Sequence, residues 1–155
     1  MKIIRVVAVL MLVVLSSCEK NTVYKKFEKN FKEKRWQKTD VRTYEFEIVQ
    51  GATPYNMDLH FAHIFGYQFP YVPLTVTIEN PDKTITTKNI NLQILDEEGK
   101  DNGDCAGDIC DLYTNVFEDQ SLPVGRYRVT ISHQFEGEFL PNILGLGIEV
   151  YASVD

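Results

Sequence analysis

Short runs in which apolar and polar residues alternate constrain the fold of this chain more than any other feature of its sequence. Between residues 44 and 48, three apolar residues fall on one side of an extended chain and two glutamates fall on the other. The same period recurs at residues 56–65, 74–78, 90–94, 127–131 and 144–151. Turns rich in Pro, Gly, Asn and Asp separate these runs. The sequence therefore predicts an all-β fold, an antiparallel β-sandwich or jelly-roll-like domain, over residues 43–155.

Length and composition agree with a single folded domain. The chain has 155 residues, of which 44% are hydrophobic and 25% are charged, as in ordinary globular proteins. The formal net charge is −6. A general nucleic-acid binder carries a basic surface, so we expect no nucleic-acid partner.

The N-terminus has the pattern of a bacterial lipoprotein signal. Lys2 and Arg5 precede ten consecutive apolar residues at positions 6–15. That run is too short to span a membrane, which takes about 20 residues. Small residues then lead to Cys18, as in a lipobox, whose cysteine thiol accepts a diacylglycerol and whose cysteine becomes the first residue after cleavage. The sequence predicts a signal peptide over residues 1–17 and a mature chain held on an envelope membrane by acyl chains on Cys18. An ordinary secretory peptide with an incidental cysteine is the alternative.

Residues 18–42 form a basic neck between the predicted lipid anchor and the sandwich. The neck holds nine basic and four acidic residues, a net charge of +5, whereas residues 43–155 hold five bases and eighteen acids, a net charge of −13. Tyr24, Phe27 and Phe31 have helical spacing, so we expect a short helix with one aromatic stripe. The neck can lie on anionic headgroups or pack against its own acidic domain, and the sequence leaves both open.

Two further cysteines, Cys105 and Cys110, lie close together in a glycine-containing loop. In an exported protein such a pair is expected to form a disulfide. A metal site is the alternative, but it needs more Cys or His ligands, and none lies nearby in the sequence.

The loop around these cysteines, residues 96–111, is rich in carboxylates. Hard oxygen ligands at this density suggest a calcium site, with Asp101, Asp104 and Asp108 as its candidate ligands. The EF-hand register fails, because Lys100 falls on a ligand position. A solvated acidic loop without an ion is the alternative. Apart from this calcium ion, we expect no cofactor.

The most unusual stretch, residues 64–73, holds four aromatic residues within seven positions, bounded by Gly and Pro. Tyr67, Phe69 and Tyr71 are the candidate surface for a protein partner or a stacked sugar. The alternative is that every second ring enters the core.

Signatures of enzymes are missing from the sequence. It has no GxSxG elbow, Walker loop, dinucleotide fingerprint or HExxH motif. His60 and His63 are three residues apart on a predicted strand, a spacing that directs the two side chains to opposite faces. We expect a protein that is not an enzyme.

Several features follow one another in a recognisable order and spacing. They are Cys18, residues 24–36 leading into Asp40, the strands at 44–48 and 57–61, the aromatic-proline stretch before Leu74, Asp96-Glu97-Glu98-Gly99-Lys100 followed by Gly103, Gly125-Arg126-Tyr127, His133-Gln134 and residues 143–148. In these features the chain resembles the GldH gliding-motility lipoprotein family of the Bacteroidetes. No single motif carries the resemblance, which covers almost the whole mature chain.

The resemblance implies a non-catalytic accessory lipoprotein of gliding motility, linked to type IX secretion and acting as a protein-interaction module. It implies an outer-membrane anchor with the domain facing the periplasm, and envelope proteins of that machinery as partners. It supplies no catalytic residues. The competing hypothesis is a carbohydrate-binding or adhesive surface lipoprotein, with Tyr67, Phe69 and Tyr71 stacking on sugar and calcium held in the acidic loop.

Overall fold

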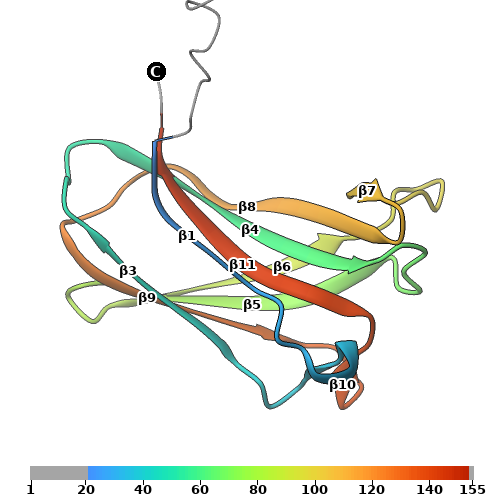
Figure 1. Cartoon of the computed structure of the whole chain (residues 1–155). Helices are drawn as coiled ribbons and strands as arrows, with labels where there is room; N and C mark the ends of the chain where they lie inside the picture. Colours follow the sequence, from blue (N-terminus) through green and yellow to red (C-terminus); the bar gives the residue numbers. More distant parts are fainter. Residues whose placement is uncertain (1–20, 154–155) are drawn as a thin grey trace, which may run out of the picture.

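A computed structural model describes residues 21–153 and shows two antiparallel sheets packed face to face (Figure 1). The predicted signal peptide and Cys18 lie outside the described residues. In chain order the elements are β1 (Thr22–Glu28), the 3₁₀ helix η2 (Lys32–Lys34), β2 (Trp36–Gln37), β3 (Arg42–Ile48), β4 (Pro54–Ile64), β5 (Tyr71–Glu79), β6 (Ile85–Gln93), β7 (Asp104–Ala106), β8 (Ile109–Ser121), β9 (Gly125–His133), β10 (Phe139–Leu140) and β11 (Ile143–Ala152). Over residues 21–153, no helix is long and apolar enough to cross a membrane.

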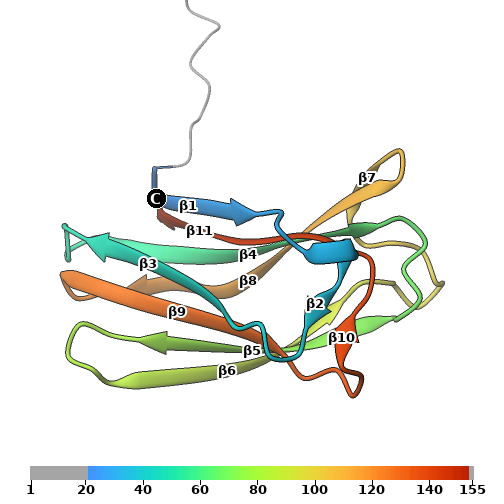
Figure 2. The ribbon, with the colours of Figure 1, turned by 60° about the horizontal axis from the view of Figure 1, so that its bottom comes forward.

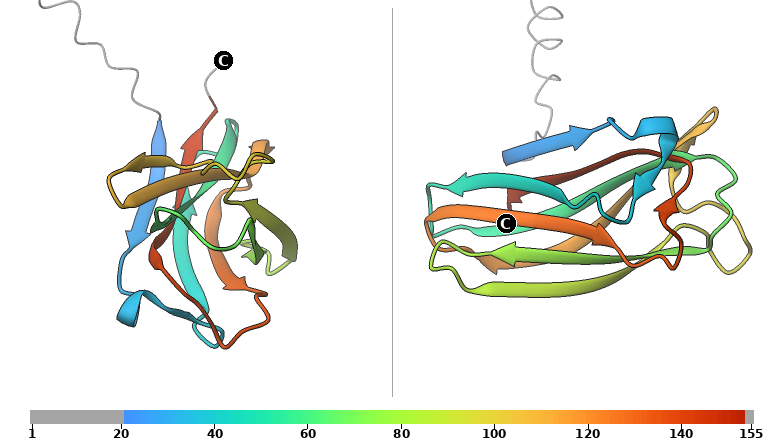
Figure 3. Two further views of the ribbon diagram at one scale, coloured as in Figure 1. Left: turned by 90° about the vertical axis from the view of Figure 1, so that its right-hand side faces the viewer. Right: turned by 90° about the horizontal axis from the view of Figure 1, so that it is seen from below.

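The two sheets form the two layers that Figures 2 and 3 show from other sides. One sheet has the strand order β1-β11-β4-β8-β7, and the other has the order β3-β9-β5-β6. The short strands β2 and β10 pair with each other beside them. The all-β antiparallel sandwich that the alternating runs predict is confirmed.

The core lies between the layers, where alternate residues of each strand meet. On β3, Tyr44, Phe46 and Ile48 are buried, and the two glutamates between them are exposed. The six predicted runs correspond to β3, β4, β5, β6, β9 and β11. Burial of these apolar side chains stabilises the sandwich by roughly 25 cal/mol per Å².

The predicted helix in the basic neck is wrong, because this segment forms β1, which pairs with β11 at the edge of the five-stranded sheet. Of the three aromatic residues assigned to its stripe, Tyr24 and Phe27 are strand residues, and Phe31 packs in the core. Phe27 lies across Gly145 and Gly147 of β11, where an added Cβ would overlap its ring or its backbone. These glycines leave a flat strip that accepts the incoming strand.

Arg42, at the start of β3, joins the neck to the domain. Its guanidinium is buried and donates hydrogen bonds to Glu28 at 3.2 Å and to Asp40. On β1, Lys25 pairs with Glu149 of β11 at 3.0 Å. Of the two placements considered for the neck, its described part therefore packs against the acidic domain, with residues 22–42 built into the sandwich.

Candidate functional site

The aromatic segment and the acidic loop, which lie apart in the sequence, meet at one end of the sandwich, at the right in Figure 1. The backbone N–H of Phe65 donates to the carbonyl of Asp108 at 3.0 Å, and that of Leu95 donates to the carbonyl of Pro70 at 3.0 Å. These bonds join the loop between β4 and β5 to the segments that flank β7. We call this end of the molecule the distal end.

The described chain begins at the other end of the same sheet. Thr22 of β1 is paired with Tyr151, close to the last residue of β11. At the distal end, Ile143, the first residue of β11, is paired with His63 of β4. The length of β11 therefore separates the start of β1 from the distal end.

The three aromatic residues predicted as a contact surface differ in their burial. Tyr67 is 3% exposed, and burial raises the pKa of its hydroxyl above the ordinary value. Phe69 is half-buried and packs on Phe135, with ring centroids 4.8 Å apart. Tyr71 is 48% exposed. The structure thus corrects the prediction for Tyr67, which is a core residue. Phe65, which was not predicted as a contact residue, is 59% exposed at the same end.

Asp96 shapes the first part of the acidic loop into a tight turn. Its Oδ1 accepts the backbone N–H of Glu98 at 2.9 Å and that of Lys100 at 2.8 Å. Gly99 has a φ of 79°, a left-handed conformation that favours glycine. Turn geometry therefore accounts for Asp96 and Gly99 in the Asp-Glu-Glu-Gly-Lys run.

The three aspartates considered as calcium ligands are not gathered at one point. The side chain of Asp101 is 5% exposed, whereas Asp104 and Asp108 are exposed. Among residues 21–153, a group of three Asp, Glu, His or Cys ligand atoms within 4.8 Å of one another occurs once, and there Asp101 meets His63 and Cys110.

Cys105 and Cys110 are joined by a disulfide. They stand directly opposite each other in the β7–β8 hairpin, with their Cα atoms 4.0 Å apart. Gly107 makes the turn of this hairpin with a φ of 62°. Cys110 is fully buried, and Cys105 is half-buried.

The two histidines of β4 lie on opposite faces of the sheet, as their spacing predicts. The ring of His60 is stacked between Phe27 and Tyr113 on the outer face, with centroid distances of 4.1 and 4.2 Å. Its Nε2 lies 2.6 Å from a carboxylate oxygen of Asp111. His63 faces the interior and is fully buried.

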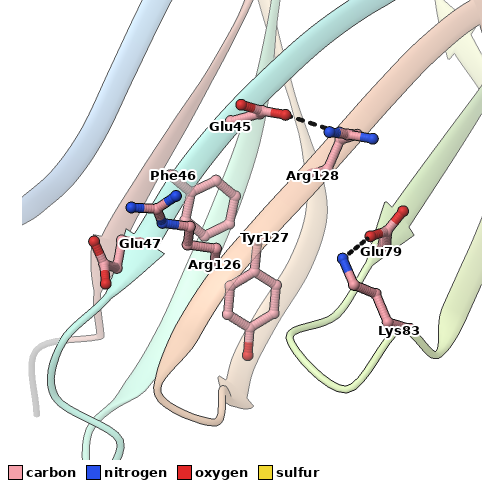
Figure 4. Close-up of a pocket in the computed structure, with 8 residues that line it drawn as sticks. All are labelled: Glu45, Phe46, Glu47, Glu79, Lys83, Arg126, Tyr127 and Arg128. Atoms are coloured by element: carbon pink, nitrogen blue, oxygen red, sulfur yellow. Dashed lines mark hydrogen bonds and ion pairs between the residues drawn. The ribbon is translucent and has the colours of Figure 1, made fainter.

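A shallow groove of about 500 Å³ lies on the outer face of the four-stranded sheet, lined by the charged side chains in Figure 4. Arg128 donates from Nε to Glu45 at 2.8 Å, and Lys83 donates to Glu79 at 2.7 Å. The hydrogen bond from Lys83 lowers the pKa of Glu79, and the bond to Glu45 raises the pKa of Arg128. The groove therefore holds one ion pair between β3 and β9 and one between the end of β5 and the turn that follows it, and these two carboxylates already have basic partners.

The model of the GldH lipoprotein family matches residues 22–150. The chain belongs to this family. The matched range runs from the first residue of β1 into β11 and so includes both sheets. Among curated proteins, none is significantly similar to the chain.

Two solved structures with some similarity come from other kinds of protein. VP2 of infectious bursal disease virus, in a subviral particle, is 14% identical with a TM-score of 0.39, over 83% of this chain and 32% of that chain. Dimeric latent PorU from Porphyromonas gingivalis is 11% identical with a TM-score of 0.37, over 88% of this chain and 14% of that chain. The GldH family member thus spans about a third or less of each protein.

Family membership identifies the chain as a lipoprotein anchored to a membrane of the cell envelope. The GldH lipoprotein family is not a known enzyme family.

Several features of the resemblance have structural roles. The hydroxyl of Tyr127 donates to the carbonyl of Pro123 at 2.8 Å, closing the entry to β9. His133 lies 3.1 Å from the carbonyl of Trp36, and Gly145 lies under the ring of Phe27. Tyr127, His133 and Gly145 therefore have roles in the fold.

Proposed function

We propose that this member of the GldH family is a non-catalytic accessory lipoprotein of gliding motility and type IX secretion that works as a protein-interaction module. The observation that carries the proposal is the family match over residues 22–150. In the groove, the carboxylates of Glu45 and Glu79 are each engaged by a base, which argues against their use as a catalytic pair. The proposed partners are envelope proteins of that machinery.

The proposal includes an anchor in the outer membrane, with the sandwich on the periplasmic side. Cys18 is the proposed acylated residue. Glu19 rather than aspartate follows it, which is compatible with an anchor in the outer membrane. No run of acidic residues of the kind expected for surface export begins at Asn21, which supports a periplasmic domain.

We assign the partner surface to the distal end. Phe65 and Tyr71 are 59% and 48% exposed there, and exposed aromatic side chains are common anchors of protein interfaces. Phe65 and Leu95 line a hollow of about 330 Å³, which can receive an apolar side chain. Because β1 begins at the opposite end of the sheet, this surface is turned away from the proposed anchor.

An affinity pull-down of the acylated protein from envelopes in mild detergent tests the proposal. The test variant is Phe65→Ala/Tyr71→Ala. The matched control is Val49→Ala/Ile85→Ala, which removes two exposed apolar side chains, 78% and 65% exposed, near the other end. We expect the wild type and the control to recover secretion or motility proteins. The test variant should recover at least about tenfold less, as expected when interface anchors are lost.

Each outcome of the pull-down has one meaning. Equal recovery by both variants would contradict the assignment of the distal end while leaving the accessory role in place. Recovery of no envelope protein by the wild type would contradict the accessory role.

Binding to a glycan array is the measurement that would then favour the carbohydrate hypothesis. The geometry supports that hypothesis less, because Tyr67 is buried and only Tyr71 of the three predicted rings is well exposed. A sugar-stacking platform needs exposed ring faces.

A further inference from the structure

Metal-binding side chains from distant parts of the sequence converge inside the distal end. His63 of β4 is the direct cross-strand partner of Cys110 of β8, and Cys110 stands opposite Cys105 of β7. Residues directly opposite each other in a ladder place their side chains on the same face of the sheet. Asp101 approaches from the loop before β7, so that one ligand atom each of His63, Asp101 and Cys110 lies within 4.8 Å of the other two.

Two polar atoms of this cluster are buried without a hydrogen-bond partner. His63 Nδ1 lies 3.0 Å from the carbonyl oxygen of Ile64, and a carbonyl only accepts, so Nδ1 carries the proton. When the imidazole holds this one proton, Nε2 offers a lone pair. Neither this atom nor Oδ2 of Asp101 has a hydrogen-bond partner. The two side chains are 0% and 5% exposed, so solvent does not satisfy them.

Direct pairing does not satisfy these atoms either. His63 Nε2 lies 3.5 Å from Oδ1 of Asp101, beyond the usual length of an N–H to oxygen hydrogen bond, and Oδ1 already accepts the N–H of Gly103 at 2.9 Å. The orientation of His63 by a backbone carbonyl is the arrangement that fixes histidine ligands in metal sites. His63 and Asp101 therefore each hold an unpartnered ligand atom close to the other residue.

The two cysteines supply the remaining ligands once their disulfide is reduced. Cys105 and Cys110 have four residues between them, within the spacing of zinc sites. The sulfurs of a disulfide are poor ligands, because the thiolate is the form that binds metal. Exchange with a dithiol breaks the sulfur–sulfur bond, gives two cysteine thiols and leaves the reductant as a disulfide. The dithiol supplies both electrons and both protons.

We propose that the dithiol form of this protein binds one Zn²⁺ through Cys105, Cys110, His63 and Asp101, and that the disulfide is its metal-free form. Two sulfurs, one nitrogen and one oxygen are a ligand set that suits tetrahedral Zn²⁺. Binding releases the two thiol protons to solvent, so the metal exchanges for protons without a further redox step. Asp101 and Cys105 also line the hollow of about 330 Å³, which gives the ion a path from solvent. This proposal is independent of the proposed function.

The test uses the acylated full-length protein in mild detergent. The protein is reduced with a dithiol, and the dithiol is then removed under anaerobic conditions. ZnCl₂ is added, and bound metal is measured after gel filtration. We expect one Zn²⁺ per chain in the reduced protein and none in the oxidised protein. Co²⁺ serves as a spectroscopic probe, and a thiolate-to-cobalt charge-transfer band with tetrahedral d–d bands is expected in the reduced protein alone. A reduced wild type that binds no stoichiometric Zn²⁺ would overturn the proposal.

Variants separate this site from a free pair of thiols. His63→Gln and Asp101→Asn are each expected to weaken Zn²⁺ binding at least about tenfold. His60→Gln and Asp104→Asn are the matched controls, because His60 lies on the other face of β4 and Asp104 is exposed, and both should bind as the wild type does. Thermal unfolding of each oxidised variant checks the fold. If His63→Gln does not fold, Asp101→Asn decides. Unchanged affinity in the folded test variants would contradict the four-ligand site.

Discussion

His133 is a residue whose ionisation should affect the stability of the whole domain. It is 2% exposed, and its Nε2 lies 3.1 Å from the carbonyl of Trp36. Its Nδ1 is buried without a hydrogen-bond partner, so a second proton there would have no acceptor. Burial accordingly lowers the pKa of His133 below its ordinary value.

The sign of the pH dependence follows from that shift. In the unfolded chain His133 takes up its proton near pH 6.5, whereas the folded protein takes it up only at lower pH. Below about pH 6.5 the unfolded state therefore binds more protons. The free energy of unfolding then decreases as the pH is lowered, until the pH is below the folded pKa. We expect His133→Gln to be less stable at pH 8 by about 1–3 kcal/mol, with a shallower loss between pH 6.5 and 5. Urea unfolding at several pH values measures both. Parallel curves for the two proteins would contradict the role of His133.

At the scale of elements, β1 depends on two glycines at the far end of the chain. A Cβ on Gly147 would lie 2.8 Å from the Cα of Phe27 and would overlap the carbonyl oxygen of Lys26. We expect Gly147→Ala to push β1 away from β11 and to destabilise the domain by about 1–3 kcal/mol. Hydrogen exchange should show faster exchange in β1, while the central strand β9 keeps its protection. Val23→Ala, at a position 45% exposed on β1, is the control and should exchange as the wild type does. Unchanged protection of β1 in Gly147→Ala would show that the strand adjusts without cost.

The alternating pattern could predict six strands, because their core-facing apolar residues recur at every second position over much of each strand. It missed β8, which has 13 residues, because the burial of β8 does not alternate where register shifts occur in its pairing with β4 near Met57. It also assigned a helix to β1, since the spacing of Tyr24 and Phe27 suits both structures. The segment forms a strand because it packs on the glycines of β11, about 120 residues away. No local window of the sequence contains both segments.

The candidate site was predictable in its segments but not in its contacts. The aromatic stretch and the acidic loop stand out in the sequence, yet which rings are exposed depends on how the loop between β4 and β5 packs. The meeting of His63 with Cys110 depends on the β4–β8 register, and 46 residues separate the two in the sequence. A search for ligands near the cysteines in the sequence therefore could not find His63.

At the scale of the whole molecule, the proposed anchor and the partner surface define how far the protein can reach. Four residue steps join Cys18 to Thr22, a span of at most about 14 Å. The 11 residues of β4 add about 37 Å to the distal end. If Cys18 is anchored as proposed, the partner surface therefore stays within about 50 Å of the membrane.

Lengthening the tether should therefore weaken partner capture without changing the fold. An insertion of 20 Gly and Ser residues between Lys20 and Asn21 adds an end-to-end distance of about 25 Å. The effective concentration of the distal end at a membrane-bound partner should then fall by about tenfold. Photo-crosslinking from Tyr71→p-benzoylphenylalanine in intact cells measures the capture, and Asn21→Gly, which changes composition but not length, is the control. Equal crosslinking with the long tether, at equal levels of acylated protein, would mean that the partner is not confined to the membrane surface. The melting temperature should be the same in all three proteins, because the insertion precedes β1.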